Sequence, residues 1–125
     1  MTLETTQVVQ HSAPYTDGVT VHVQVVRMGS SLVAWLGASD NQSEVGMEPR
    51  GRIDSLALAM HSKFNTVAST LLSKGVDDPS EVIAKRIASK TKMNVFVTCD
   101  LSTNDSDLQV FAERTLMQTI KQLLQ

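Results

Sequence analysis

The segment that most constrains the fold is residues 19–38, VTVHVQVVRMGSSLVAWLGA, where two β-type runs face each other across a short turn. In the first run, one face carries valines at alternate positions, a period of two that is typical of a half-buried strand. The valines are Val19, Val21, Val23 and Val25. The second run, residues 32–38, is apolar on both faces, so we expect an interior strand covered on both sides, with Trp35 in the core. Gly29 suits the tight turn, and the segment predicts an antiparallel hairpin.

Three more segments have strand character. Residues 56–60, LALAM, form a short apolar run that has helical propensity, but its length and the turn-like residues 62–65 favour a strand. Residues 66–72, TVASTLL, are the natural partner of a second hairpin. The strand-like run NVFVTC follows later, at residues 94–99.

Two segments have helical patterns. The first helix is expected to end near Lys90, with Asp78 as its N-cap, Pro79 at the first helical position and Glu81 as the acid of a capping box. The second is expected over residues 108–124. Its candidate caps are Asp105, Ser106 and Asp107.

The resulting order β-β-β-β-α-β-α predicts an α+β domain with one largely antiparallel β-sheet that carries two α-helices. A length of 125 residues fits a single domain. Residues 1–17 are polar and contain Pro14, so we expect a flexible N-terminal segment or a poorly paired edge segment, followed by the domain over residues 18–125. The polar stretch 39–54 predicts a long mobile loop.

The last helix has two apolar stripes when it is projected at 100° per residue. The first, with Phe111 at its edge, contains Leu108, Ala112, Leu116, Ile120 and Leu123. The second contains Val110, Met117 and Leu124. A helix needs only one stripe to dock on its own sheet, so the second is our candidate partner-binding surface. The alternative is that both stripes are buried in one core.

The side chains that usually carry out chemistry are scattered. His11, His22 and His61 have no ligand spacing with one another or with a cysteine, so we expect no metal site. The glycine spacing matches no phosphate-binding loop, so we expect no cofactor. Cys99 lies in a strand-like run, where a buried thiol is normally inert. We expect no catalytic residue, and an enzyme that uses Cys99 is the weakest alternative.

The charge balance limits the class of partner. With 11 basic residues, 13 acidic residues and 4% aromatic residues, the chain does not resemble a nucleic-acid binder. No apolar run approaches the roughly 20 residues that span a membrane, and the first residues lack a signal-peptide pattern. We expect a cytoplasmic protein, with the nucleus as a second compartment. One basic cluster is suited to an acidic protein partner: Lys85, Arg86, Lys90 and Lys92.

Several blocks resemble the proteasome assembly chaperone 4 family, in the right order over residues 19–124. The sequence RMGSSLVAWLGA is similar to that family's Ser-Leu-x-x-Trp-x-Gly hairpin. LALAM and STLL resemble its third and fourth strands. AKRIASKT followed by NVFVT resembles its first helix and the next strand, and Asn-Asp-Ser before the last helix also matches. The loop over residues 39–54 is longer than expected for the family.

The resemblance implies a non-catalytic, ATP-independent chaperone with an antiparallel sheet and helices. It implies a heterodimer with proteasome assembly chaperone 3 that helps to build the alpha ring of the proteasome core particle. The implied client is chiefly the alpha-5 subunit, and the pair leaves before the mature particle forms. The alternative is a small dimeric adaptor of the roadblock or longin type in a trafficking complex, which would also combine an antiparallel sheet with helices.

Overall fold

The alternating valines form the predicted hairpin. β2 (Val19–Met28) and β3 (Ser31–Asp40) pair antiparallel, with Met28 opposite Ser31 at the closed end. The turn is therefore two residues long. Its first residue, Gly29, has a φ of 58°, a left-handed conformation that a side chain would make costly.

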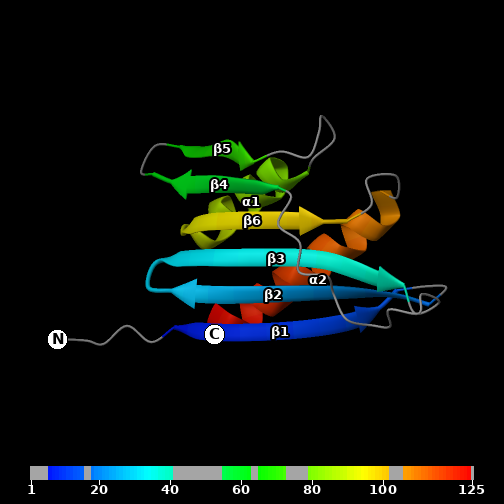
Figure 1. Cartoon of the computed structure of the whole chain (residues 1–125). Helices are drawn as coiled ribbons and strands as arrows, with labels where there is room; N and C mark the ends of the chain where they lie inside the picture. Colours follow the sequence, from blue (N-terminus) through cyan, green and yellow to red (C-terminus); the bar gives the residue numbers. More distant parts are fainter. Residues whose placement is uncertain are drawn as a thin grey trace.

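The computed structural model describes residues 6–15, 18–40, 55–62, 65–72, 79–101 and 106–124, which form one sheet and two helices (Figure 1). The sheet order is β1-β2-β3-β6-β4-β5. The other elements are β1 (Gln7–Pro14), β4 (Leu56–His61), β5 (Thr66–Leu72), α1 (Ser80–Thr91), β6 (Asn94–Asp100) and α2 (Ser106–Leu124). Only the β3–β6 pair is parallel among these described strands, and the other four pairs are antiparallel. The predicted largely antiparallel α+β class is confirmed.

The sheet contains one strand more than the sequence predicts. β1 pairs with β2 along its whole length, from Gln7 opposite Arg27 to Pro14 opposite Thr20. Of the two expectations for residues 1–17, the edge position is correct for residues 7–14, but both poor pairing and flexibility are wrong there, since each of these eight residues pairs with β2. The polar sequence gives no alternating signal because an edge strand gains its order from the ladder of backbone hydrogen bonds with its neighbour.

The predicted loop over residues 39–54 begins inside the sheet. Ser39 and Asp40 are the last residues of β3 and pair with β2, so the predicted start of the loop is wrong. The rest of that loop, residues 41–54, lies outside the described residues.

Both helices lie on the same face of the sheet, behind it in Figure 1. α1 packs on β4, β5 and β6, and α2 packs on β1, β2 and β3. Tyr15 and Phe111, whose ring centroids are 5.1 Å apart, join the end of β1 to α2. The core between sheet and helices is aliphatic, and its largest buried side chains include Val21, Val23, Val25, Leu32, Leu36, Ile83, Ile87, Leu116 and Ile120.

The opposite face of the sheet, which we call the open face, carries no helix of the described residues. On β3, Leu32, Ala34 and Leu36 are buried beneath the helices, whereas Val33 and Trp35 on the open face are only half-buried. Among the described residues, no second layer covers this face of β3, so the prediction of a strand covered on both sides with Trp35 in the core is wrong for that part of the chain. A strand between two neighbours can be interior to the sheet and still present one face outside the core.

Trp35 lies along the sheet over Gly37. A Cβ atom at Gly37 would come within 2.6 Å of Cη2 of the Trp35 ring. The glycine two positions after the tryptophan therefore leaves the space that the ring fills.

α1 begins one residue later than predicted. Pro79 occupies the N-cap position and makes no side-chain capping bond, and Asp78 lies outside the described residues. The carboxylate of Glu81 accepts a hydrogen bond of 2.5 Å from the Thr70 hydroxyl on β5. The capping box predicted for Glu81 involves Asp78 and therefore lies outside the described residues. α2, in contrast, begins at Ser106, two residues earlier than predicted, so Ser106 and Asp107 belong to its first turn, and Asp105 lies outside the described residues.

A buried serine pair fixes the start of α1 to the sheet. The hydroxyls of Ser55 and Ser80 are 2.9 Å apart, and the Cys99 amide donates to the Ser80 hydroxyl over 3.2 Å. Ser55 also donates to the Cys99 carbonyl over 3.3 Å. Because Ser55 and Ser80 are at most 1% exposed, water cannot replace these bonds.

Replacing Ser55 by alanine should destabilise the fold by about 1–3 kcal/mol, because the Cys99 carbonyl and the Ser80 hydroxyl lose a partner in the core. Urea unfolding followed by circular dichroism measures the change. The control is Ser89→Ala on the exposed side of α1, which should stay within about 0.5 kcal/mol of the unsubstituted chain. Equal stability of the two variants would contradict the role of the pair.

Candidate functional site

The residues considered for chemistry do not form an active site. Cys99 is 1% exposed and lies in the aliphatic core, where a thiol cannot meet a substrate. His11 is exposed on β1, and Nδ1 of His61 lies 3.3 Å from the Thr66 hydroxyl. In the described ranges, no group of three or more His, Cys, Asp or Glu side chains could hold a metal ion. None of the described helices has the length and apolar character that crossing a membrane requires.

His22 crosslinks three strands. Its Nδ1 lies 2.7 Å from the Ser12 hydroxyl on β1, and its Nε2 lies 2.7 Å from the Ser39 hydroxyl on β3. A neutral imidazole donates from one nitrogen and accepts at the other, and serine hydroxyls can serve either need. The side chain is 8% exposed, and this desolvation lowers the pKa of His22 from its ordinary value of 6.5.

This lowered pKa makes stability depend on pH. Below pH 6.5 the unfolded chain binds a proton at His22 that the folded chain still excludes, so the free energy of unfolding should fall as the pH drops through 6.5. The loss should end below the folded-state pKa. The midpoints of urea unfolding at about pH 7.5 and at about pH 5.5 measure this loss of stability. The variant His22→Gln cannot take up this proton, so its urea midpoint should change less between the two pH values. An equal change in the variant and in the unsubstituted chain would show that His22 is not the group responsible.

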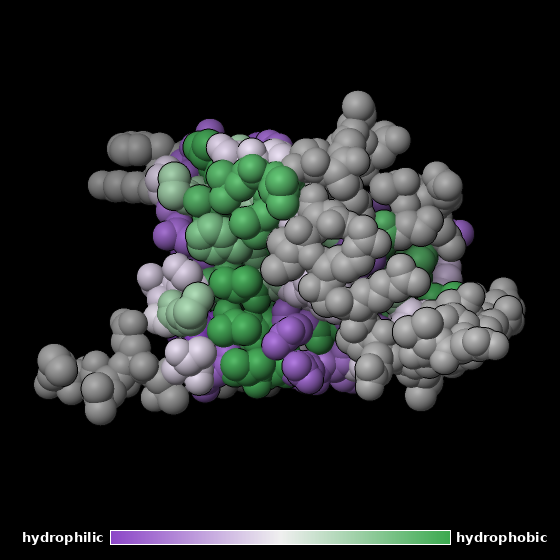
Figure 2. All heavy atoms as spheres, in the orientation of Figure 1, coloured by the Kyte–Doolittle hydropathy of each residue, from purple (hydrophilic) through white to green (hydrophobic). Residues whose placement is uncertain are grey.

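The open face carries a row of side chains that crosses all six described strands. Successive pairings place Val8 opposite Val26, Val26 opposite Val33, Val33 opposite Phe96, Phe96 opposite Leu58, and Leu58 opposite Ser69. We call these six residues the central row. Figure 2 shows the corresponding band of hydrophobic surface, which runs across the strands from the β5 edge to the β1 edge.

Large apolar side chains of this face are exposed to solvent. Val8 is 54% exposed, and the paired residues Met60 and Val67, which flank the central row, are 50% and 52% exposed. Scattered apolar residues are normal on a protein surface, whereas a connected apolar patch across a sheet is a feature that protein–protein interaction sites share. This surface could not be predicted from the sequence, because its residues come from six strands and lie side by side only as a result of how the strands pair.

The two apolar stripes of α2 differ in how deeply they are buried. Leu108, Ala112, Leu116 and Ile120 of the first stripe are buried, and Leu123 packs against the core from a half-buried position. In the second stripe, Val110 is 55% exposed, whereas Met117 and Leu124 are half-buried and touch the core. The alternative of two fully buried stripes is therefore wrong for Val110.

Val110 and Met117 line a cleft of about 390 Å³ between α1 and α2, which we call the interhelical cleft. Its walls carry four basic residues: Arg86 and Lys90 from α1, and Arg114 and Lys121 from α2. Arg86 spans the cleft and donates from Nη1 to both carboxylate oxygens of Glu113, at 2.8 Å each. The described part of the chain supplies no carboxylate partner to the other three.

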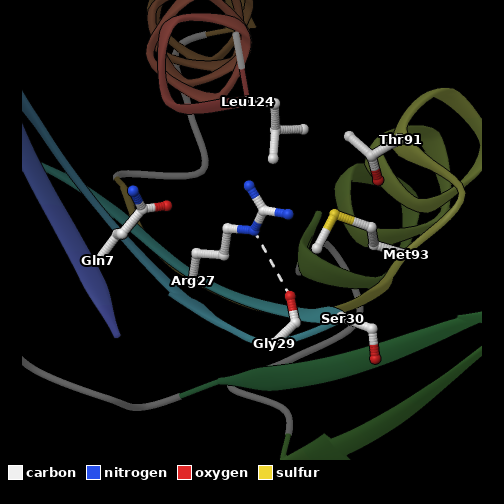
Figure 3. Close-up of a pocket in the computed structure, with 7 residues that line it drawn as sticks. All are labelled: Gln7, Arg27, Gly29, Ser30, Thr91, Met93 and Leu124. Atoms are coloured by element: carbon white, nitrogen blue, oxygen red, sulfur yellow. Dashed lines mark hydrogen bonds between the residues drawn. The ribbon is translucent and has the colours of Figure 1, made fainter. Parts of the chain in front are cut away.

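A second hollow, of about 730 Å³, lies at the C-terminal ends of the two helices, and we call it the end pocket. Leu124, the third residue of the predicted stripe, forms part of its wall with Thr91 and Met93 (Figure 3). The Arg27 side chain reaches into it from β2. Its Nε donates to the Gly29 carbonyl over 3.4 Å, and its two terminal nitrogens point toward Leu124. The structure thus places all three predicted partner-binding residues in neighbouring hollows.

Similarity to known proteins identifies the family of this chain. Residues 20–101 match the family model described as proteasome assembly chaperone 4. Proteasome assembly chaperone 4 from Homo sapiens and from Mus musculus are each 30% identical to this chain over 103 residues, which is 81% of this chain and 75% of each relative. The predicted resemblance is confirmed.

The fold also has a solved counterpart. A crystal structure of a chaperone complex for yeast 20S proteasome assembly contains a chain that superposes with a TM-score of 0.65. The match covers 95% of this chain and 94% of that chain at 15% identity, so it supports the fold alone. The family model and the two relatives favour a chaperone over the trafficking adaptor. This chain belongs to the proteasome assembly chaperone 4 family.

Proposed function

We propose that this chain pairs with a proteasome assembly chaperone 3-like protein through its open face. The pair promotes assembly of the alpha ring of the proteasome core particle by binding alpha subunits, chiefly alpha-5. It acts by surface complementarity, with no catalytic step and no bound cofactor. We propose that it works in the cytoplasm, with the nucleus as a second compartment.

The observation that carries this proposal is the central row on the open face. Five of its six residues are apolar, and they lie on strands whose other face already carries the aliphatic core. An apolar sheet face of this kind is stabilised when a second sheet or helix layer covers it. A partner with the same architecture would present a sheet face that can pack against this one. Family membership supports the same conclusion from the sequence.

Co-expression with a chaperone 3-like protein and with single alpha subunits tests the proposal. Native mass spectrometry should find a one-to-one complex of the two chaperones, and this complex should bind alpha-5 more tightly than other alpha subunits. The isolated chain and bovine serum albumin are the controls. A tagged chain that captures neither the related chaperone nor an alpha subunit would overturn the proposal.

A further inference from the structure

Basic side chains cluster on the helical side of the molecule, although the chain as a whole has a small negative net charge. The chain has a formal net charge of −2, yet the described residues that line the interhelical cleft include Arg86, Lys90, Arg114 and Lys121 and, as an acid, only Glu113. Arg27 adds a fifth cation in the end pocket. These residues come from three elements and converge only in the folded chain. Like charges placed together cost stability, which an anionic partner can reverse.

Apolar side chains lie among these cations. Val110 is 55% exposed at the cleft, with Met117 one heptad further along α2. Leu124 is one heptad beyond Met117, in the wall of the end pocket. The three apolar contacts therefore follow the α2 axis while basic residues flank them on both helices. This arrangement matches an elongated ligand with apolar side chains on one side and carboxylates at its edges.

The two hollows are neighbours. Lys90 and Lys121 line the interhelical cleft, and the residues Thr91 and Leu124, one and three positions further along the chain, line the end pocket. Arg27 presents the terminal nitrogens of its guanidinium there (Figure 3). A guanidinium binds a carboxylate through paired hydrogen bonds, so this pocket is suited to an acidic side chain at the end of the same ligand.

We propose that the interhelical cleft and the end pocket together bind an acidic amphipathic segment of a partner protein. The carboxylates of the segment pair with Lys90, Arg114 and Lys121, and its apolar side chains contact Val110 and Met117. A nucleic acid fits less well, since the described residues that line the two hollows include no aromatic ring on which a base could stack. The surface lies across the sheet from the open face, so this inference is independent of the proposed heterodimer.

The test uses the full chain and a fluorescein-labelled two-heptad peptide of glutamate, alanine and leucine, with the leucines at heptad spacing. Fluorescence anisotropy should detect saturable binding. Raising the salt concentration from about 0.05 to about 0.3 M should weaken this binding several-fold. A peptide in which lysine replaces each glutamate should not bind. A peptide with alanine at each leucine should bind about tenfold more weakly, because it loses the contacts with Val110 and Met117.

Two double variants with the same change in charge locate the site. Arg114→Glu with Lys121→Glu should raise the Kd of the acidic peptide at least about tenfold. Lys85→Glu with Lys92→Glu, at exposed positions outside both hollows, should change it less than about twofold. Both variants should keep the melting temperature within a few degrees and should still form the chaperone heterodimer.

Each of three results would overturn the proposal. The first is absence of peptide binding, or equal binding of the lysine peptide. The second is an equal loss of affinity in the two double variants, which would indicate attraction to overall charge. The third is displacement of the peptide by oligouridine or by phosphatidylserine vesicles at lower concentration than by unlabelled peptide, which would assign the cations to another class of macromolecule. Loss of the heterodimer with intact peptide binding would count against the proposed function alone.

Discussion

Replacing Phe96 by aspartate is expected to weaken pairing with the related chaperone at least about a hundredfold while the chain itself still folds. Phe96 lies at the centre of the central row, opposite Val33 on one side and Leu58 on the other. A carboxylate there would be buried without a partner when a second layer covers the open face, and an unpaired buried charge is strongly unfavourable. In the free chain the same carboxylate stays accessible to water.

The cost to the fold should be about 1–2 kcal/mol, since Phe96 is half-buried and aspartate disfavours strands. Native mass spectrometry measures the pairing, and thermal melting measures the fold. Val8→Asp provides a second variant at the β1 edge of the central row, where a stability cost is smallest because the side chain is 54% exposed. It should weaken pairing about tenfold.

Val82→Asp is the matched control for Phe96→Asp. Val82 is 51% exposed on α1, on the opposite side of the molecule, so its replacement adds the same charge away from the open face. Its pairing should equal that of the unsubstituted chain. Normal pairing of Phe96→Asp, or equal loss in Val82→Asp, would show that the heterodimer uses another surface.

Leu116→Ala should remove about 2–5 kcal/mol from the free energy of unfolding, a large part of the roughly 5–15 kcal/mol that a domain has. Leu116 is fully buried where α2 packs on β1, β2 and β3, and truncation leaves a cavity that the surrounding strands cannot close. Urea unfolding followed by circular dichroism measures the change from the shift in midpoint.

Val110→Ala is the control on the same helix. Val110 belongs to the second apolar stripe and is 55% exposed, so its truncation should change stability by less than about 0.5 kcal/mol. The pair of variants separates a stripe that holds the domain together from one that is available to a partner. A loss at Val110 as large as that at Leu116 would place both stripes in the core.

Most of the fold could be predicted because it depends on local patterns. The alternating valines of β2 identify its buried face, and Gly29 identifies the turn. The spacing of Leu116 and Ile120 identifies the side of α2 that packs on the sheet. In each case a residue and its near neighbours in the chain decide which side is apolar, so the signal is contained in a short window.

The prediction failed where order depends on a distant segment. β1 has no apolar alternation and is ordered by its ladder with β2. The N-terminal turn of α1 is connected to the sheet by a serine pair 25 positions apart in the chain instead of by a side-chain cap. Only part of the site could be predicted. Val110, Met117 and Leu124 were identified as a stripe, and Arg86 and Lys90 as members of a basic cluster. That Arg27, Arg114 and Lys121 lie near them was not predicted.

The sequence by itself determined the hairpin, the two helices, the buried stripe of α2 and the family. Only the tertiary structure decided that both helices lie on one face, which leaves the central row on the open face, and that Arg27, Arg86 and Arg114 converge from three elements. The physical reason is that periodicity specifies which side of an element is apolar but not which layer covers it. That choice depends on strand pairing and helix packing between segments far apart in the chain.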